Sequence, residues 1–231
     1  IDTLYRKHHQ NDISFSMTYA FTEKFMLPLS HDEVVHGKGA IIGRMPGDEW
    51  QRFANLRLLF AYMFTHPGTK LNFMGNEIGQ TTEWKHDESL PWHLLQYPIH
   101  QGIQKVMADL NQLYKSEPAL YEDSFTQNGF EWIDYSDAEN SVLAYLRKGI
   151  VPHESILVIC NFSVNAIGNY RVGVPAPGDF REIFNSDSTI YGGSGFTNGR
   201  IIKTEKIASH GKTESIVLKL PPLGMAALKR A

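Results

Sequence analysis

Hydrophobic and polar positions divide the chain into two halves of different texture. Up to about Leu120, apolar residues recur at helical spacing between clusters of His, Trp and acidic residues, and short β-type runs separated by Gly, Asn, Asp and Pro follow. One helix is predicted from about Glu49 to Phe64, where Asp48 is a good N-cap and the tripeptide "HPG" stops the pattern. A second helix is predicted within "HQGIQKVMADLNQLYKSEP", whose apolar residues share one face before the proline.

Two short strands are expected ahead of these helices. Phe25 to Leu29, "FMLPL", and Leu71 to Met74 each read as a buried strand that opens into a polar loop. The alternation of strand, loop and helix is typical of a parallel sheet or barrel. The segment from Asn11 to Lys24 is ambiguous from its pattern alone, because its apolar residues fit both a strand and a helix.

The second half contains six strand candidates with no helix between them, which suggests a β-sandwich. They are "FEWID", "SVLAYLRK", "SILVICNF", "YRVGV", "REIFN" and "SIVLKL". The glycines of the loop from Gly192 to Gly199 are interpreted as turn formers and not as a phosphate cradle.

Composition narrows the class of protein. With 231 residues, 42% of them hydrophobic, the chain is long enough for one large domain or two small ones. A net charge of −3 gives no reason to expect nucleic acid or an anionic membrane as partner. No apolar stretch is long enough to span a membrane, and Cys160 reads as a buried residue in a reducing compartment, so we expect a cytoplasmic protein. The chain begins without an initiator methionine, and we expect it to be a piece of something longer.

The stretch "SHDEVVHGKG" invites a metal or phosphate interpretation, and its spacing argues against both. His31 and His36 are five residues apart, about 140° around a helix, so they cannot face one metal as the histidines of H-E-x-x-H do. Lys38 is followed by Gly39 where a phosphate loop needs Ser or Thr. We therefore expect neither a metal nor a cofactor.

A third interpretation places a ligand at the strand ends. His31 and Asp32 come just after the first expected strand, and Glu77 and Gln80 come after the second. Ligands bind at the carboxyl ends of parallel strands in α/β barrels, and neighbouring strands lie about 4.8 Å apart. The two groups are therefore expected to converge on one small molecule.

Aromatic side chains in the following loop extend this candidate site. Trp84 and Trp92 lie between the second strand and the second helix, and His36 follows the His-Asp pair closely. Flat aromatics beside carboxylates and an imidazole suit a sugar, whose ring has apolar faces and hydroxyl edges. Ordinary loop packing explains the two tryptophans about equally well. We take Glu77, Gln80, Trp84, Trp92 and His36 as substrate-binding candidates.

Longer strings carry a family resemblance. "LPLSHDEVVHGKG", "MPGDEWQRFANLRLLFAYMFTHPGTKLNFMGNEIGQ", "GFEWIDYSDAENSVLAYLRK" and "LPPLGMAALKR" resemble the C-terminal part of bacterial 1,4-α-glucan (glycogen) branching enzymes of the α-amylase superfamily. The resemblance implies that residues 1–120 are the C-terminal part of a (β/α)8 TIM barrel and that residues 121–231 are an all-β C-terminal sandwich. It also implies that the two strands are the seventh and eighth of the barrel and that residues 11–24 are its sixth helix.

The resemblance also implies an activity. Such enzymes transfer an α-1,4-glucan chain to an α-1,6 branch point by a retaining double displacement. Asp32 would be a third carboxylate that stabilises the transition state, with His31 as its hydrogen-bonding neighbour. The nucleophile and the acid/base would lie upstream, since no D-G-[FL]-R-x-D string occurs here, so this chain alone is expected to be inactive.

The partners implied are an α-glucan substrate and the N-terminal remainder of the same enzyme. Two alternatives remain open. One is a hydrolase of the same superfamily, and the other is a non-catalytic carbohydrate-binding module.

Overall fold

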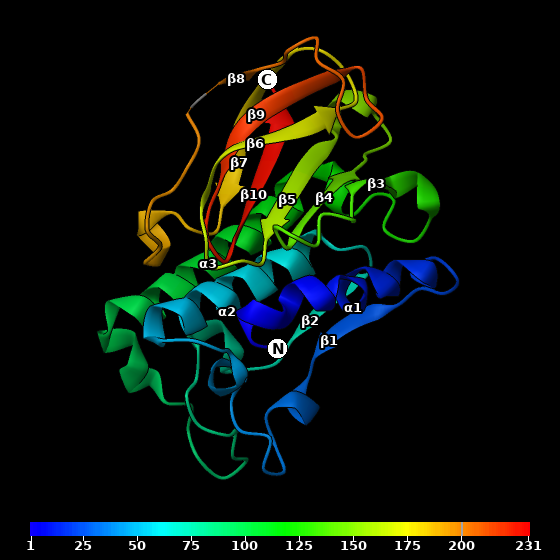
Figure 1. The fold of residues 1–231 in the computed structure, drawn as a ribbon. Helices are drawn as coiled ribbons and strands as arrows, with labels where there is room; N and C mark the ends of the chain where they lie inside the picture. The colour runs from blue at the N-terminus through cyan, green and yellow to red at the C-terminus, as the bar shows by residue number, and fades with distance from the viewer. Residues whose placement is uncertain (200) are drawn as a thin grey trace.

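The computed structural model describes residues 1–199 and 201–231 as a helical layer lying between an antiparallel sandwich and a short parallel sheet (Figure 1). The α-helices are α1 (Gln10–Ser14), α2 (Glu49–Thr65) and α3 (Pro98–Ser116). The strands are β1 (Met26–Leu29), β2 (Thr69–Asn72), β3 (Phe130–Asp134), β4 (Val142–Arg147), β5 (Ile156–Asn161), β6 (Ile167–Val174), β7 (Asp179–Asn185), β8 (Ile202–Lys203), β9 (Glu214–Leu220) and β10 (Gly224–Arg230). Short 3₁₀ turns occupy many of the connections.

The first half of the chain builds a βα unit. Strands β1 and β2 pair in parallel, from Met26 opposite Thr69 to Leu29 opposite Asn72, and α2 lies between them in sequence. The start of α2 is fixed by a capping box, in which the Gln51 N–H donates to Asp48 Oδ1 at 2.8 Å and the Asp48 N–H donates to Gln51 Oε1 at 3.1 Å. The parallel pair expected from the sequence is confirmed, with both ends of β2 shifted two residues toward the N-terminus. The two strands were expected to be buried, but their residues alternate between exposed and partly buried.

In the part of the chain that the structure describes, β1 and β2 form a parallel sheet of two strands, the number expected from the sequence. A further expectation for this half is corrected. Residues 11–24 do not form one helix, because α1 ends at Ser14 and a 3₁₀ turn follows over Phe15–Thr18. The hydroxyl groups explain this break. Thr18 Oγ1 donates to the Phe15 carbonyl at 2.8 Å and Thr22 Oγ1 to the Tyr19 carbonyl at 2.8 Å, and such bonds compete with the helical ladder.

The second half is a two-layered antiparallel sandwich. One sheet has the order β3-β4-β5-β10-β7-β8, and β6 pairs with β9 in a second sheet that lies across it (Figure 1). All six predicted strands are present. No strand was predicted at β10, which occupies the middle of the larger sheet between β5 and β7.

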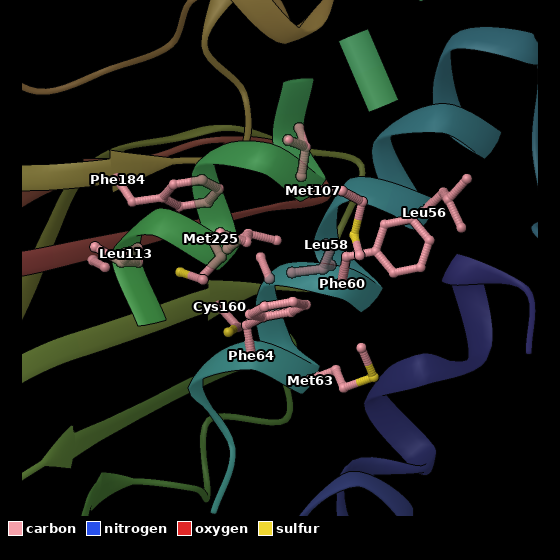
Figure 2. Close-up of a cluster of buried hydrophobic side chains, with 14 of the residues drawn as sticks. Leu56, Leu58, Phe60, Met63, Phe64, Met107, Leu113, Cys160, Phe184 and Met225 are labelled. Carbon is pink, nitrogen blue, oxygen red and sulfur yellow. The ribbon is translucent and has the colours of Figure 1, made fainter. Parts of the chain in front are cut away.

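Each face of the larger sheet carries a hydrophobic core. On one face, Phe60 of α2 and Met107 of α3 meet Cys160 of β5 and Met225 of β10 (Figure 2). On the other face, β4, β5 and β10 pack against β6 and β9, through residues that include Ile159. Every residue of β4 and β5 is therefore buried, which explains why these strands read as continuous apolar runs. Burial also raises the pKa of the Cys160 thiol.

Over residues 1–199 and 201–231, no helix combines the length and the apolar character that a bilayer crossing requires.

Candidate functional site

The His31–Asp32 pair lies directly after β1, on a 3₁₀ helix that spans His31–Glu33. Ser30 caps this helix, since its hydroxyl oxygen accepts the Asp32 N–H at 3.2 Å. His31 Nε2 lies 3.4 Å from Asp32 Oδ1, and the two side chains are 58% and 68% exposed. The local fold thus presents a paired imidazole and carboxylate to solvent at the end of a parallel strand.

A row of rings joins this pair to Trp84. The His31 ring lies 5.9 Å from the Phe73 ring, and the Phe73 ring lies 5.1 Å from that of Trp84 at an interplanar angle of 82°. The strand register brings them together, because the Phe73 N–H donates to the Leu29 carbonyl at 2.9 Å. Phe73 thus lies between the His31 ring and the Trp84 ring, and both Phe73 and Trp84 also pack against the hydrophobic core. A role of these residues in ligand binding stays a prediction.

Backbone contacts hold the loop that follows the pair. Lys38 Nζ donates to the Asp32 carbonyl at 2.6 Å, and the Glu83 carboxylate accepts the N–H groups of Gly37 at 3.0 Å and Gly39 at 3.1 Å. These N–H donors, Gly37 first, hold the pKa of the Glu83 carboxyl below its usual range. His36 lies in this loop with an exposed side chain and a φ of 59°.

Glu77 lies apart from the His31–Asp32 turn. It lines a hollow of about 580 Å³ together with Lys70 and Asn72 of the second strand and Asn111 of α3. Within the described ranges, no residue of the His31–Glu33 turn is among those that line this hollow. The structure therefore does not bring Glu77 and Asp32 into one cavity.

The remaining candidates differ in exposure. The Gln80 side chain is buried, with only 8% of the residue exposed, and its Nε2 donates to the Thr82 carbonyl at 2.8 Å. Trp92 is 52% exposed at the start of a 3₁₀ helix that runs to Gln96. Trp92 is thus accessible to a ligand, whereas the buried Gln80 side chain is hydrogen-bonded to the backbone of its own loop.

Lys70 is a buried amine beside the Glu77 hollow. Its Nζ donates to the carbonyls of His66 and Gly68, the latter at 2.7 Å, and lies 5.5 Å from the centre of the Tyr114 ring. Burial, and after it the nearby charge of Arg147, lowers the pKa of Lys70 to about 6.

A second, mainly apolar hollow of about 560 Å³ lies between the N-terminal segment, β1 and α2. Leu27, Leu58 and Tyr62 line it, together with His66, whose pKa burial lowers to about 4. In the described part of the chain, none of the candidate residues named from the sequence lines this hollow.

Sequence reasoning missed three side chains around the pair, namely Phe73, Lys38 and Glu83. Phe73 was predicted inside the second strand, Leu71 to Met74, whereas the observed strand ends at Asn72 and Phe73 follows it. Glu83 contacts Gly37 across 46 residues of sequence, so that contact can be recognised only from the fold.

Comparison with known proteins identifies a consistent set of relatives. The family of the alpha amylase C-terminal all-beta domain matches residues 132–231. The 1,4-alpha-glucan branching enzyme GlgB of Aquifex aeolicus is 55% identical over 228 residues, covering 99% of this chain and 36% of that protein. The 1,4-alpha-glucan branching enzyme GlgB 1 of Xanthomonas euvesicatoria is 53% identical, covering 99% of this chain and 31% of that protein.

Solved structures share the fold at lower identity. A debranching enzyme of Nostoc punctiforme superposes with a TM-score of 0.56 at 16% identity, covering 84% of this chain and 34% of that one. The Ttha1563 protein of Thermus thermophilus gives a TM-score of 0.57 at 18% identity, with the same coverage. At this identity the likeness concerns the fold alone.

The resemblance expected from the motifs is confirmed. The chain is similar to 1,4-α-glucan branching enzymes over nearly its whole length, and residues 132–231 match a C-terminal all-β domain of the α-amylase family. The chain spans about a third of the length of the curated relatives that it matches.

Proposed function

We propose that this chain is the C-terminal part of a 1,4-α-glucan branching enzyme, which cuts an α-1,4-linked glucan and rejoins the released chain through an α-1,6 link. One observation carries the proposal. An exposed His31–Asp32 pair stands at the carboxyl end of a parallel strand, in a chain that is 55% identical to a branching enzyme over 99% of its length.

We further propose that residues 1–120 belong to a (β/α)8 barrel and that residues 121–231 are a C-terminal sandwich domain. The parallel pairing of β1 with β2 and the helix α2 between them support the barrel assignment. Completing a barrel would require strands beside both free edges of the pair, which the rest of the protein would supply.

In the proposed reaction, Asp32 acts on the sugar at the cleavage point. Its carboxylate accepts hydrogen bonds from sugar hydroxyls and favours the oxocarbenium-like transition state through its negative charge. His31 Nε2 lies 3.4 Å from one oxygen of that carboxylate, and the Ser30 hydroxyl donates to the other at 3.3 Å. The nucleophile and the acid/base come from the rest of the protein, so the isolated chain is expected to be inactive.

The sugar-binding surface extends along the aromatic row. Trp84 is half-buried and reaches the pair through Phe73, and Trp92 offers a more exposed ring farther along the same loop. We keep Glu77, Gln80 and His36 as substrate-binding candidates. The hollow beside Glu77 supports a role for it at a neighbouring sugar, and Gln80 would act by shaping the loop.

The test is an Asp32→Asn variant of the full-length protein, assayed on amylose for new α-1,6 linkages. Removing the charge while keeping the shape is expected to lower kcat by roughly 10²- to 10³-fold, the range found for groups that stabilise developing charge. Asp87→Asn, in an exposed loop, is the matched control and is expected to retain activity. Branching within a few-fold of wild type in Asp32→Asn would refute the assigned role.

The same assay separates the alternatives. Free reducing ends without new branch points would identify a hydrolase of the superfamily. Glucan binding without either product would identify a carbohydrate-binding module. We also propose a cytoplasmic location, supported by a single cysteine that is free and buried.

A further inference from the structure

Glu83 joins two loops at the carboxyl ends of the parallel strands. Its two carboxylate oxygens are used separately, because Oε1 accepts the Gly37 N–H at 3.0 Å and Oε2 accepts the Gly39 N–H at 3.1 Å. Glu83 belongs to the loop after β2, whereas both glycines belong to the loop after β1. The carboxylate therefore connects the two loops that carry the candidate site.

The backbone of the first loop needs such a support. His36, Gly37 and Gly39 have φ values of 59°, 80° and 68°, all in the left-handed region. A non-glycine residue such as His36 adopts this region at an energetic cost, so the surrounding contacts must maintain it. Backbone N–H groups in such turns can converge on one anion, and here the N–H groups of Gly37 and Gly39 both donate to the Glu83 carboxylate.

The loop is coupled to the proposed site through Lys38. This residue lies between the two anchored glycines, and its Nζ donates to the Asp32 carbonyl at 2.6 Å. A second connection runs beside it, where the Trp84 N–H donates to the Val34 carbonyl at 2.9 Å. Displacement of the glycines would therefore move Lys38, and with it the backbone that carries the Asp32 carboxylate.

We propose that Glu83 is a positioning residue that holds the His36–Gly39 loop against the loop after β2, and that it thereby fixes the placement of Asp32 toward the sugar. This inference rests on the proposed function. Asp32 sits on a turn of three residues with a side chain that is 68% exposed, so its own packing supplies little restraint. Small errors in placement are costly in catalysis, since a displacement of about 1 Å can reduce the rate by roughly 10²-fold.

The test compares Glu83→Gln with Glu88→Gln in the full-length protein. The amide in Glu83→Gln keeps one acceptor oxygen but offers an N–H₂ group to the second glycine, so one of the two tethers is lost. Glu88 is the matched control, because it lies in the same loop and its carboxylate pairs with Lys85 at the surface. We expect Glu83→Gln to lower kcat for branching at least about tenfold with KM within about twofold, and Glu88→Gln to change neither.

Two further readouts separate positioning from a general structural role. Amide hydrogen exchange of Gly37 and Gly39 should become faster in Glu83→Gln while the midpoint of thermal unfolding stays that of the control. In an Asp32→Asn background, Glu83→Gln should cause no further loss of kcat, because residues that act through one another are not additive.

The outcomes are distinguishable. An unchanged kcat or unchanged glycine exchange in Glu83→Gln, with the kcat of Asp32→Asn lowered as expected, overturns the positioning role alone. The same fold loss in both backgrounds also overturns it, since Glu83 would then act independently of Asp32. Full branching by Asp32→Asn overturns the proposed function of Asp32 and the positioning role with it.

Discussion

Arg147 offers a direct test of how the sandwich is attached to the helices. Its guanidinium is fully buried and donates to three backbone carbonyls, those of Thr65 at 2.8 Å, Leu120 at 3.2 Å and Gly129 at 3.3 Å. It also donates to Ser124 Oγ at 3.2 Å. One side chain of β4 thus connects the C-terminal end of α2 with the segment between α3 and β3.

The expected cost of Arg147→Met follows from the groups left behind. Burial lowers the pKa of Arg147 to about 10, so the side chain remains charged at neutral pH and its hydrogen bonds are charge-assisted. Replacing both members of a buried polar pair by apolar groups can be neutral, but here the carbonyls stay in place. The Gly129 carbonyl keeps the Lys148 N–H at 3.0 Å and the Leu120 carbonyl keeps the Ser124 hydroxyl at 2.9 Å, whereas the Thr65 carbonyl loses its partner. The unpaired Thr65 carbonyl costs about 1 to 3 kcal/mol, and the loss of the charge-assisted bonds to the other two carbonyls adds to this cost. Relief of the arginine's desolvation offsets part of this sum, and a net loss of about 3 kcal/mol is expected.

Urea denaturation of wild type and Arg147→Met, followed by far-UV circular dichroism and by tryptophan fluorescence, measures this loss. Arg181→Met is the matched control, because Arg181 is an exposed arginine of β7, and its cost should stay within about 0.5 kcal/mol. A difference of less than about 1 kcal/mol between the two variants would show that the carbonyls find other donors, and the reasoning from unpaired groups would be wrong.

Two other predictions concern α3 and the buried amine. Replacing glycine by alanine in an ordinary helix interior stabilises it by about 1 kcal/mol, but in Gly102→Ala the added Cβ would lie 2.4 Å from the Tyr191 carbonyl oxygen. We therefore expect urea melts to show a destabilisation of about 1 to 3 kcal/mol. A stabilised variant would contradict the close packing. Burial lowers the pKa of Lys70 from 10.5 to about 6, so between these pH values the unfolded chain binds more protons and the free energy of unfolding rises with pH. Lys70→Met should lack this rise when unfolding is measured at several pH values from 6 to 10. Equal slopes of unfolding free energy against pH for the two proteins would refute the shift.

Helix caps and apolar runs in the sequence predicted those helices and strands whose positions depend mainly on neighbouring residues. The cap at Asp48 placed the start of α2 correctly, and the apolar runs of β4 and β5 indicated strands that are buried on both faces. β10 escaped prediction because three of its buried positions are Gly224, Ala226 and Ala227, residue types that are depleted in strands. Its central place follows from pairing with β5 on one side and β7 on the other, which is a tertiary contact.

The candidate site was predictable only up to the ends of the strands. His31 and Asp32 follow β1 directly, so the strand prediction placed them correctly. Gln80 was expected beside them, yet the loop after β2 turns back on itself, with the Gln80 N–H donating to the Gly75 carbonyl at 3.0 Å and Gly75 at a φ of 92°. A left-handed glycine reverses the chain and buries the side chain that a straight extension of the strand would have exposed.

The site and the sandwich are mechanically connected through α2. The parallel pair has only two strands in the described residues, and such a pair is not stable by itself. Leu27 and Leu29 of β1 pack on the same core that joins α2 to the larger sheet, and β2 begins four residues after α2 ends at Thr65. Because Arg147 of the sandwich holds the Thr65 carbonyl, the sandwich restrains the helix end from which β2 departs. Loosening that contact should therefore disturb β2, which leads into Phe73 and the loop of Glu83, and through them the sandwich would contribute to the geometry around Asp32.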